Sequence, residues 1–268
     1  MKNIKSVLLI FLLSFTLGGC QFHGWGWLEN DSTILSAHRG AHTVAPENTL
    51  ESIKEAAKLQ YKIIEIDPRE SKDGAIYLMH DDTVNRTTNG TGKIENLTSN
   101  QINKLEISTS QYPNLKTKKI KVPTFESAVK EASKDGLIIN VDGSKANWSG
   151  KTFSKKIVDV LKHNKVFEKS FFVISNKDQR DSFNEQYPEA CISWLVDDSS
   201  EITDEIDLAA KYKHVLLSIS NKYATKEHIA KLNREGIYYQ VYGVNDSKRL
   251  QELKGMQVKM VETDTLVP

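Results

Sequence analysis

Cysteine is scarce in this sequence, and neither sign of charge is in excess. Its 268 residues include two cysteines, Cys20 and Cys191, so no disulfide can form within the chain if Cys20 is modified, and we expect Cys191 to be a small buried apolar residue. Lysine and arginine total 36 against 35 acidic residues, a balance that lacks the basic footprint of a nucleic-acid-binding protein. An apolar run near the start, residues 7–17, is too short for a permanent membrane-spanning helix. The length and the 39% of hydrophobic residues suit one barrel-sized domain or two small ones.

The first 31 residues have the pattern of an export leader followed by a tether. A short basic start, the apolar run and a small-residue exit predict a signal peptide over residues 1–19. The exit before Cys20 resembles a bacterial lipobox, which implies that Cys20 becomes the lipidated, palmitate-bearing first residue and that residues 20–31 tether the chain to a membrane. An ordinary signal peptide with an incidental cysteine is the alternative.

The lipobox resemblance also implies a location. A lipidated protein of this kind is expected in the cell envelope, on the extracytoplasmic side. Gln21 follows Cys20, where an aspartate is associated with retention in the inner membrane. The expectation is therefore the outer membrane or the periplasm if the host has two membranes.

Beyond residue 31, short apolar runs alternate with amphipathic helical stretches. Such alternation is typical of parallel α/β folds, in which each helix connects two strands. Eight strands are predicted, at residues 34–38, 63–67, 137–142, 171–175, 191–196, 214–219, 238–244 and 259–262. Helices are predicted near residues 49–59, 125–133, 153–163, 177–187, 201–211, 226–235 and 247–253. The sequence therefore predicts an α/β fold, a (β/α)₈ TIM barrel, over residues 32–268.

One apolar run breaks this alternation. Residues 75–80 follow the strand that ends at Asp67 after a short polar stretch, whereas a parallel crossover needs about a dozen residues or more. A hairpin that turns at Asp73-Gly74 is predicted instead, and it returns His80 to the level of Asp67 and His38. Residues 82–122 lack strong periodicity, so we predict a small insertion there that caps the barrel mouth.

Two acidic residues stand at the end of the second predicted strand. The period of two along a strand places Glu65 and Asp67 on one face and Ile66 on the other. Neighbouring carboxylates repel each other unless a cation lies between them, and an all-oxygen set suits a hard divalent ion. One divalent cation, Ca²⁺ or Mg²⁺, is therefore predicted at the carboxyl ends of the strands, where the active sites of such barrels lie.

Six short motifs follow one another in the first half of the chain. They are His38-Arg39-Gly40, Pro46-Glu47-Asn48-Thr49, Glu65-Ile66-Asp67, Lys72-Asp73-Gly74, His80-Asp81 and Arg86-Thr87-Thr88-Asn89-Gly90. In this order they resemble the opening signature of the glycerophosphodiester phosphodiesterase family. The resemblance is strongest over residues 34–105 and continues to the C-terminus. It implies a (β/α)₈ barrel with a small insertion domain where residues 82–122 stand.

The resemblance implies roles for the matched residues. The two histidines of the family act as general base and general acid, here His38 and His80, and an ordinary pKa of about 6.5 suits both tasks. Arg39 is expected to grip phosphoryl oxygens with its planar fork, and Glu47 and Asn48 to border the substrate on the first loop.

Three positions depart from the family pattern. The family's third acidic ligand is a glutamate in an Asn-x-Glu-x-Lys pattern, and here Asp142, one methylene shorter, takes its place as a metal ligand. The family lysine, a substrate-binding residue, is displaced by one position to Lys145. That displacement turns Lys145 to the opposite face of a strand unless Gly143 forms a bulge. Tyr242 replaces a tryptophan beside the alcohol part of the substrate.

Together these expectations describe a metal-dependent phosphoric diester hydrolase. It would convert glycerophosphodiesters to glycerol 3-phosphate and an alcohol, by attack of water or of a glycerol hydroxyl through a cyclic phosphate. One alternative is a glycerol-phosphate polymer or a lysophospholipid headgroup as substrate at the cell envelope. A catalytically weakened envelope binding protein is the other, and the retention of both His38 and His80 opposes it. The expected partners are a small or lipid-derived phosphodiester and, through Cys20, a membrane, and the choice between monomer and oligomer stays open.

Overall fold

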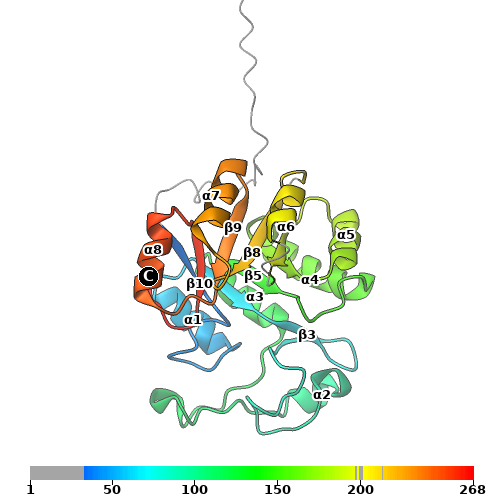
Figure 1. Ribbon diagram of the computed structural model, residues 1–268. Coiled ribbons are helices and arrows are strands. Elements are labelled where there is room, and N and C mark those ends of the chain that lie inside the picture. Colours follow the sequence, from blue (N-terminus) through cyan, green and yellow to red (C-terminus); the bar gives the residue numbers. More distant parts are fainter. Residues whose placement is uncertain (1–32, 197, 199–201, 213) are drawn as a thin grey trace, which may run out of the picture.

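The computed structural model describes residues 33–196, 198, 202–212 and 214–268. Its barrel strands are β1 Ile34–Ala37, β2 Ile63–Ile66, β5 Ile138–Asp142, β6 Phe171–Ile174, β7 Cys191–Val196, β8 Val215–Ser220, β9 Tyr238–Tyr242 and β10 Met260–Thr263. They are parallel and close in the order β1-β10-β9-β8-β7-β6-β5-β2 (Figure 1). The predicted TIM barrel is therefore confirmed. The predicted signal peptide, the tether and Cys20 lie outside the described residues.

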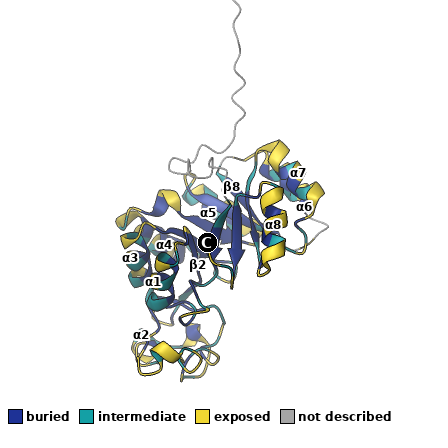
Figure 2. Cartoon of the chain, turned by 90° about the vertical axis from the view of Figure 1, so that its left-hand side faces the viewer, coloured by how far each residue is buried: buried dark blue, intermediate teal, exposed yellow. Residues whose placement is uncertain are grey.

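Amphipathic helices surround the barrel. They are α1 Leu50–Lys58, α3 Phe125–Lys134, α4 Lys151–His163, α5 Lys177–Gln186, α6 Ile202–Ala209, α7 Lys226–Glu235 and α8 Ser247–Gly255, with a 3₁₀ turn, η4 Phe167–Lys169, before β6. In α1 the hydroxyl of Thr49 accepts a hydrogen bond from the amide of Ser52, and Ile53 and Ala56 are fully buried in the core between helices and strands. Figure 2 shows this burial pattern around the barrel, where the strands are buried and the outer faces of the helices are exposed. In the described part of the chain, no helix is long and apolar enough to cross a membrane.

Several strands end earlier than predicted. β1 ends at Ala37 and β2 at Ile66, so His38 and Asp67 are the first loop residues instead of the last strand residues. Arg39 has a φ of 55°, a left-handed backbone conformation through which an extended strand does not continue. β9 ends at Tyr242 because Gly243 has a φ of 75°. The residues predicted to act at the strand ends thus stand where the chain turns.

Two layers of side chains fill the barrel interior. The deeper layer is apolar and includes Ile63, Ile138, Phe171, Cys191, Leu216 and Met260. Because successive inward-facing residues of a strand are two apart, the next layer consists of Ser36, Glu65, Asn140, Val173, Ser193, Ser218, Gln240 and Glu262. All of these are at most 7% exposed. Barrel interiors usually hold bulky branched apolar residues, so this mainly polar layer calls for an explanation beyond packing.

The predicted hairpin is present between β2 and α3. Strands β3 Pro68–Glu70 and β4 Ile76–Leu78 pair antiparallel. The amide of Met79 donates a hydrogen bond to the carbonyl of Asp67 at 2.9 Å, so His80 returns beside Asp67 as expected. The hairpin therefore adds a second wall to the site.

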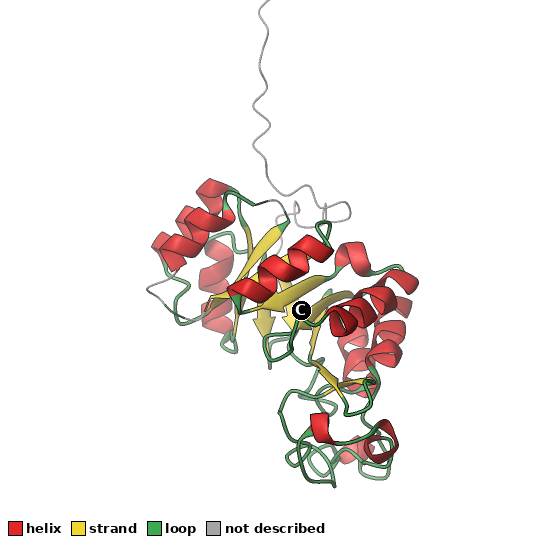
Figure 3. Ribbon diagram, turned by 90° about the vertical axis from the view of Figure 1, so that its right-hand side faces the viewer, coloured by secondary structure: helices red, strands yellow, loops and turns green. Residues whose placement is uncertain are grey.

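Residues 82–122 extend away from the barrel (Figure 3). They contain three short helical turns, η2 Ile94–Asn96, α2 Ser99–Ile102 and η3 Pro113–Leu115. With the hairpin they build a small core of Tyr77, Met79, Val84, Ile94, Ile102, Ile107, Ile120 and Val122, separate from that of the barrel. The region lacks regular periodicity in sequence because irregular loops supply most of this core.

Candidate active site

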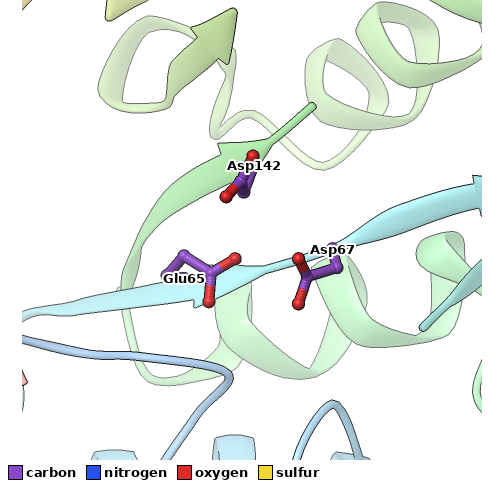
Figure 4. Close-up of side chains that lie close together, drawn as sticks. All are labelled: Glu65, Asp67 and Asp142. Atoms are coloured by element: carbon purple, nitrogen blue, oxygen red, sulfur yellow. The ribbon is translucent and has the colours of Figure 1, made fainter. Parts of the chain in front are cut away.

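Three carboxylates meet at the carboxyl ends of β2 and β5. Glu65 lies in β2, Asp67 directly follows it and Asp142 ends β5. The two strands are neighbours, with Ile66 opposite Val141. One oxygen atom from each carboxylate lies within 4.8 Å of the other two, and Figure 4 shows the side chains pointing toward one another. The three residues predicted as metal ligands are thus brought together.

The electrostatics of this trio fit a divalent cation. Burial raises the pKa of Glu65 well above its ordinary value, and the charges of Asp67, Glu262 and Asp142 raise it further. Burial and the charge of Asp142 also raise the pKa of Asp67. The Oε1 atom of Glu65 is buried without a hydrogen-bond partner. A hard cation satisfies such an all-oxygen set and removes the repulsion that raises these pKa values.

Arg39 reaches the carboxylates from the loop after β1. Its amide donates to Glu65 Oε2 at 2.7 Å, its Nη1 donates to Glu47 Oε1 at 3.2 Å, and its Nε lies 3.8 Å from Asp67 Oδ2. That Nε atom is buried and makes no hydrogen bond. The turn depends on Gly40, where φ is 77° and an added Cβ would lie 2.4 Å from Ser52 Oγ. Arg39 therefore presents a guanidinium beside the proposed metal ligands.

Asn48 orients Asp67. Its Nδ2 donates to Asp67 Oδ2 at 2.7 Å, and its Oδ1 accepts from the amide of Asp67 at 3.1 Å. Asn48 is 3% exposed and has a φ of 54°, a left-handed backbone conformation that asparagine adopts more readily than most residues other than glycine. The sequence predicts that Asn48 binds substrate, and the structure shows both ends of its side-chain amide bonded to Asp67, one to the carboxylate and one to the backbone.

His38 is held by the last barrel strand. Its Nδ1–H donates to Asp264 Oδ1 at 2.6 Å, and its Nε2 lies 3.9 Å from Glu65 Oε2. Burial lowers the pKa of His38, but the hydrogen bond to Asp264 and the charge of Glu262 outweigh burial, so the pKa is raised overall. Asp264 thereby fixes the tautomer that points Nε2 into the site.

His80 has a matching arrangement on the other side. Its Nδ1–H donates to Asp81 Oδ1 at 2.8 Å, and its Nε2 accepts a hydrogen bond from Lys145 Nζ at 2.7 Å. The sequence requires a bulge at Gly143 for Lys145 to face the site, but β5 has already ended and the amide of Ser144 donates to Asp142 Oδ1 at 2.7 Å in a turn. Side chains alternate between two faces only within a strand, so this alternation does not decide where Lys145 points.

Gly143 is needed for packing instead. A Cβ at this position would lie 1.9 Å from Nε1 of the buried Trp148, whose N–H donates to the carbonyl of Gly143 at 2.8 Å. Only glycine allows the indole to lie against the backbone that leads to Lys145.

A network of ion pairs links the first loop to the hairpin and the insertion. Arg86 donates to both oxygens of Glu47, at 2.7 and 2.8 Å, and to both oxygens of Asp81, at 2.7 and 3.0 Å. Arg69 pairs with Asp82 and donates to the carbonyl of Lys145 at 3.2 Å. Glu47, predicted to border the substrate, therefore lies between two arginines, Arg39 and Arg86.

A cavity of about 220 Å³ opens beside His38 and runs into the barrel. Asp142, Tyr242, Glu262 and Asp264 are among its lining residues. The predicted position of Tyr242 at the site is thus consistent with the structure. No role was expected for Glu262, Asp264, Asp81 or Arg86, although each is a charged residue at a strand end or in a matched motif, which is the signal that points to it.

Sequence comparison supports the resemblance. A model of the glycerophosphoryl diester phosphodiesterase family matches residues 38–267. The glycerophosphodiester phosphodiesterase of Bacillus subtilis is 32% identical over 170 residues, which are 61% of this chain and 57% of that protein. The human glycerophosphodiester phosphodiesterase 1 is 42% identical over 112 residues, 42% of this chain and 34% of that protein. The chain thus spans between a third and about three fifths of the length of these curated relatives.

Solved structures share the fold. A glycerophosphodiester phosphodiesterase from Agrobacterium tumefaciens superposes with a TM-score of 0.71 at 22% identity, covering 87% of this chain and 97% of that one. An Oleispira antarctica phosphodiesterase, solved in complex with the product sn-glycerol-3-phosphate, gives 0.73 at 23% identity and covers 86% and 92%. Because the family model matches most of its length, this chain belongs to the glycerophosphoryl diester phosphodiesterase family.

Proposed function

We propose that this protein hydrolyses glycerophosphodiesters to glycerol 3-phosphate and an alcohol, with one divalent cation, Ca²⁺ or Mg²⁺. The observation that carries the proposal is the meeting of Glu65, Asp67 and Asp142 within 4.8 Å of one another, beside Arg39 and His38 and next to the hairpin that returns His80 to Asp67. A phosphodiester is an anion with a poor leaving group, so its cleavage needs charge neutralisation and proton transfer at both oxygens.

The cation, held by Glu65, Asp67 and Asp142, would supply charge neutralisation at the phosphoryl oxygens. His38 and His80 each keep Nδ1 on a carboxylate, so Nε2 is the atom that takes or gives a proton. At His80 this atom accepts from Lys145 Nζ, which would turn to a phosphoryl oxygen when substrate binds. One histidine removes the proton of the attacking hydroxyl or water, and the other protonates the departing alcohol. Arg39 and Lys145 bring positive charge to the oxygens of the phosphate.

The test is the release of glycerol 3-phosphate from glycerophosphocholine by the chain from residue 21 onward, with Ca²⁺, with Mg²⁺ and with EDTA. We expect turnover with one of the cations and none with EDTA. Cation binding without turnover of any phosphodiester would instead favour an envelope binding protein.

A longer substrate is a second candidate, favoured by one observation. A groove of about 490 Å³ lies beside Lys145 and is also lined by Lys72, Lys151 and Phe153. It runs along residues 69–72 of the hairpin from Lys145, whose Nζ donates to His80, and its volume suits further units of a glycerol-phosphate polymer or a lysophospholipid headgroup. A kcat/KM for poly(glycerol phosphate) at least about tenfold above that for glycerophosphocholine would support this candidate.

We also propose that Cys20 carries a lipid that holds the barrel in the cell envelope, on the extracytoplasmic side. The leader and the residues around Cys20 support this, because an exported domain with more than one acyl chain on its first residue is stably anchored to a membrane. Cells grown with labelled palmitate should label the wild-type chain and not Cys20→Ser. Equal labelling of both chains would contradict the proposal.

A further inference from the structure

The cavity beside His38 penetrates the barrel as far as its polar layer. Its deep end is formed by Asn140, Ser218, Gln240 and Glu262, which come from four different strands and are each at most 7% exposed. Its upper end adjoins His38 and Asp142. The cavity therefore leads from the proposed phosphate site into the barrel, and a molecule that fills it must satisfy this polar floor.

Glu262 is the unusual member of the floor. A carboxylate on an inward barrel position is costly to bury, and burial raises the pKa of Glu262 to about 7. Its Oε2 accepts one hydrogen bond, from Asn140 Nδ2 at 2.9 Å. Within the described residues no group donates to its other oxygen. Glu262 is also none of the three carboxylates that meet as metal ligands. Its charge favours the protonated form of His38, but this leaves its second oxygen without a donor.

The neighbours of Glu262 have spare acceptors too. Asn140 Oδ1 and Gln240 Oε1 are buried without a hydrogen-bond partner, and both residues are 1% exposed. The amide nitrogens of the two side chains are already used. Asn140 Nδ2 donates to Glu262 Oε2, and Gln240 Nε2 donates to Ser218 Oγ at 2.6 Å. Leaving a buried acceptor unpaired costs about 1–3 kcal/mol, so the floor is short of donors.

A floor that holds a carboxyl group and spare acceptors selects its occupant by chemistry. It offers a phosphate no cation, and it gives an acyl or alkyl chain nothing to offset the desolvation of Glu262. A neutral hydroxyl supplies a donor at the size of this cavity. The phosphate is expected at Arg39, His38 and His80, so a polyol on that phosphate has its terminal hydroxyl farthest from phosphorus and deepest in the barrel.

We propose that Glu262, with Gln240 and Asn140, binds the terminal hydroxyl of the glycerol moiety and makes the site selective for phosphodiesters in which that hydroxyl is free. This inference rests on the proposed hydrolase function and names the residues that choose its substrate. Glu262 is the specificity-determining residue that accepts from the hydroxyl, Asn140 positions it through the hydrogen bond at 2.9 Å, and Gln240 borders the hydroxyl on the floor.

The test compares two substrates that differ at one atom. One is the glycerol diester, and the other is the propane-1,2-diol diester, which lacks the terminal hydroxyl but keeps the hydroxyl next to the phosphate, so attack by either route is still available. Wild-type protein should prefer the first by about 100-fold or more in kcat/KM, because a site built around a hydroxyl rejects the analogue that lacks it. In Glu262→Leu the preference should fall below about tenfold, and Glu262→Gln should lie between.

A binding experiment gives a second readout without turnover. Calorimetric titration with glycerol 3-phosphate and with propane-1,2-diol phosphate should show the same preference in Kd, with a partial loss in Glu262→Gln and a larger one in Glu262→Leu. Ser193→Ala is the matched control, because Ser193 belongs to the same polar layer but does not line the cavity. Its preference should equal that of the wild type, and a thermal melt verifies that each variant is folded.

Two outcomes would overturn the proposal. In the first, folded Glu262→Gln and Glu262→Leu keep the full wild-type preference in both experiments. In the second, the substitutions change the preference between choline and ethanolamine as leaving alcohols and leave the glycerol preference intact, which would put the leaving alcohol on the floor. If wild-type protein turned over no diester at all, the proposed hydrolase function would be wrong. The titration would still show whether Glu262 binds the terminal hydroxyl.

Discussion

The two histidines of the site have the same local arrangement, but they belong to parts of the molecule that are held in different ways. His38 follows a barrel strand, and its partner Asp264 follows the neighbouring strand β10, whose pairing with β1 fixes their separation. His80 follows the hairpin strand β4, and its surroundings are joined by Arg86, whose side chain is 48% exposed. Exposed ion pairs stabilise weakly, whereas a barrel ladder is cooperative. The barrel half is therefore expected to be preformed, and the hairpin half to depend on its ion pairs.

The largest effect is expected from removing either imidazole. We expect His38→Ala and His80→Ala each to lower kcat by about 10²–10⁴. The activation free energy of the double variant should rise by no more than the two single increases added together, because one proton-transfer sequence needs both groups. Steady-state kinetics with glycerophosphocholine and calorimetric metal binding measure this, and metal affinity should stay within about threefold. His163→Ala, on the exposed end of α4, is the control. A variant of either histidine with near wild-type turnover would remove that residue from the mechanism.

The second largest effect is expected from substitution of a metal ligand, and the direction in which the thermal stability changes is informative. Burial and like charges raise the pKa of Glu65, so without metal its folded form binds a proton that the unfolded form has lost. Metal-free stability should then fall as pH rises from about 4.5 toward the raised folded pKa. Glu65→Gln should melt at a higher temperature than wild type without metal at pH 7, and should lose the increase that Ca²⁺ or Mg²⁺ gives to wild type. A metal-induced increase of equal size in both proteins would contradict the ligand set.

The fold and half of the site follow from local sequence. Apolar runs predict all eight strands, and the period of two predicts that Glu65 and Asp67 share a face. The hairpin follows from a connection too short for a crossover, and it correctly returns His80 to Asp67. These inferences succeed because each depends on residues that are near one another in the chain.

What could not be predicted depends on barrel closure and on irregular backbone. His38 and Asp264 are 226 positions apart, and their contact exists only because β1 and β10 close the barrel. The polar layer around Glu262 likewise needs the register of every strand. Lys145 reaches His80 through a turn, where the alternation of side chains along a strand predicts nothing. The predicted ends of β1 and β2 are one residue late because the residues that turn the chain there, His38 and Asp67, are themselves site residues.

A smaller effect is expected from Asp264→Ala in the barrel half. Asp264 and the charge of Glu262 raise the pKa of His38 against the effect of burial, so removing Asp264 should lower that pKa. The limb of the pH profile of kcat/KM that His38 controls should move to lower pH, and the other limb should stay. Movement of the acidic limb identifies His38 as the base, and movement of the basic limb identifies it as the acid. A shift to higher pH, or none, would show that Asp264 does not set the charge of His38.

The smallest effect, and the one that bears most directly on the difference between the halves, is expected from Arg86→Lys. Lysine keeps the charge but cannot reproduce the fork that donates to both oxygens of Asp81 and of Glu47. We expect kcat/KM to fall by about tenfold, because His80 is less well oriented, while the thermal midpoint of the barrel changes little. Arg234→Lys is the control, because this exposed arginine on α7 pairs only with its neighbour Glu235 in the described residues. If Arg86→Lys were as active as wild type, the backbone bond from Met79 to Asp67 would suffice to place His80, and the hairpin half would be as preformed as the barrel half.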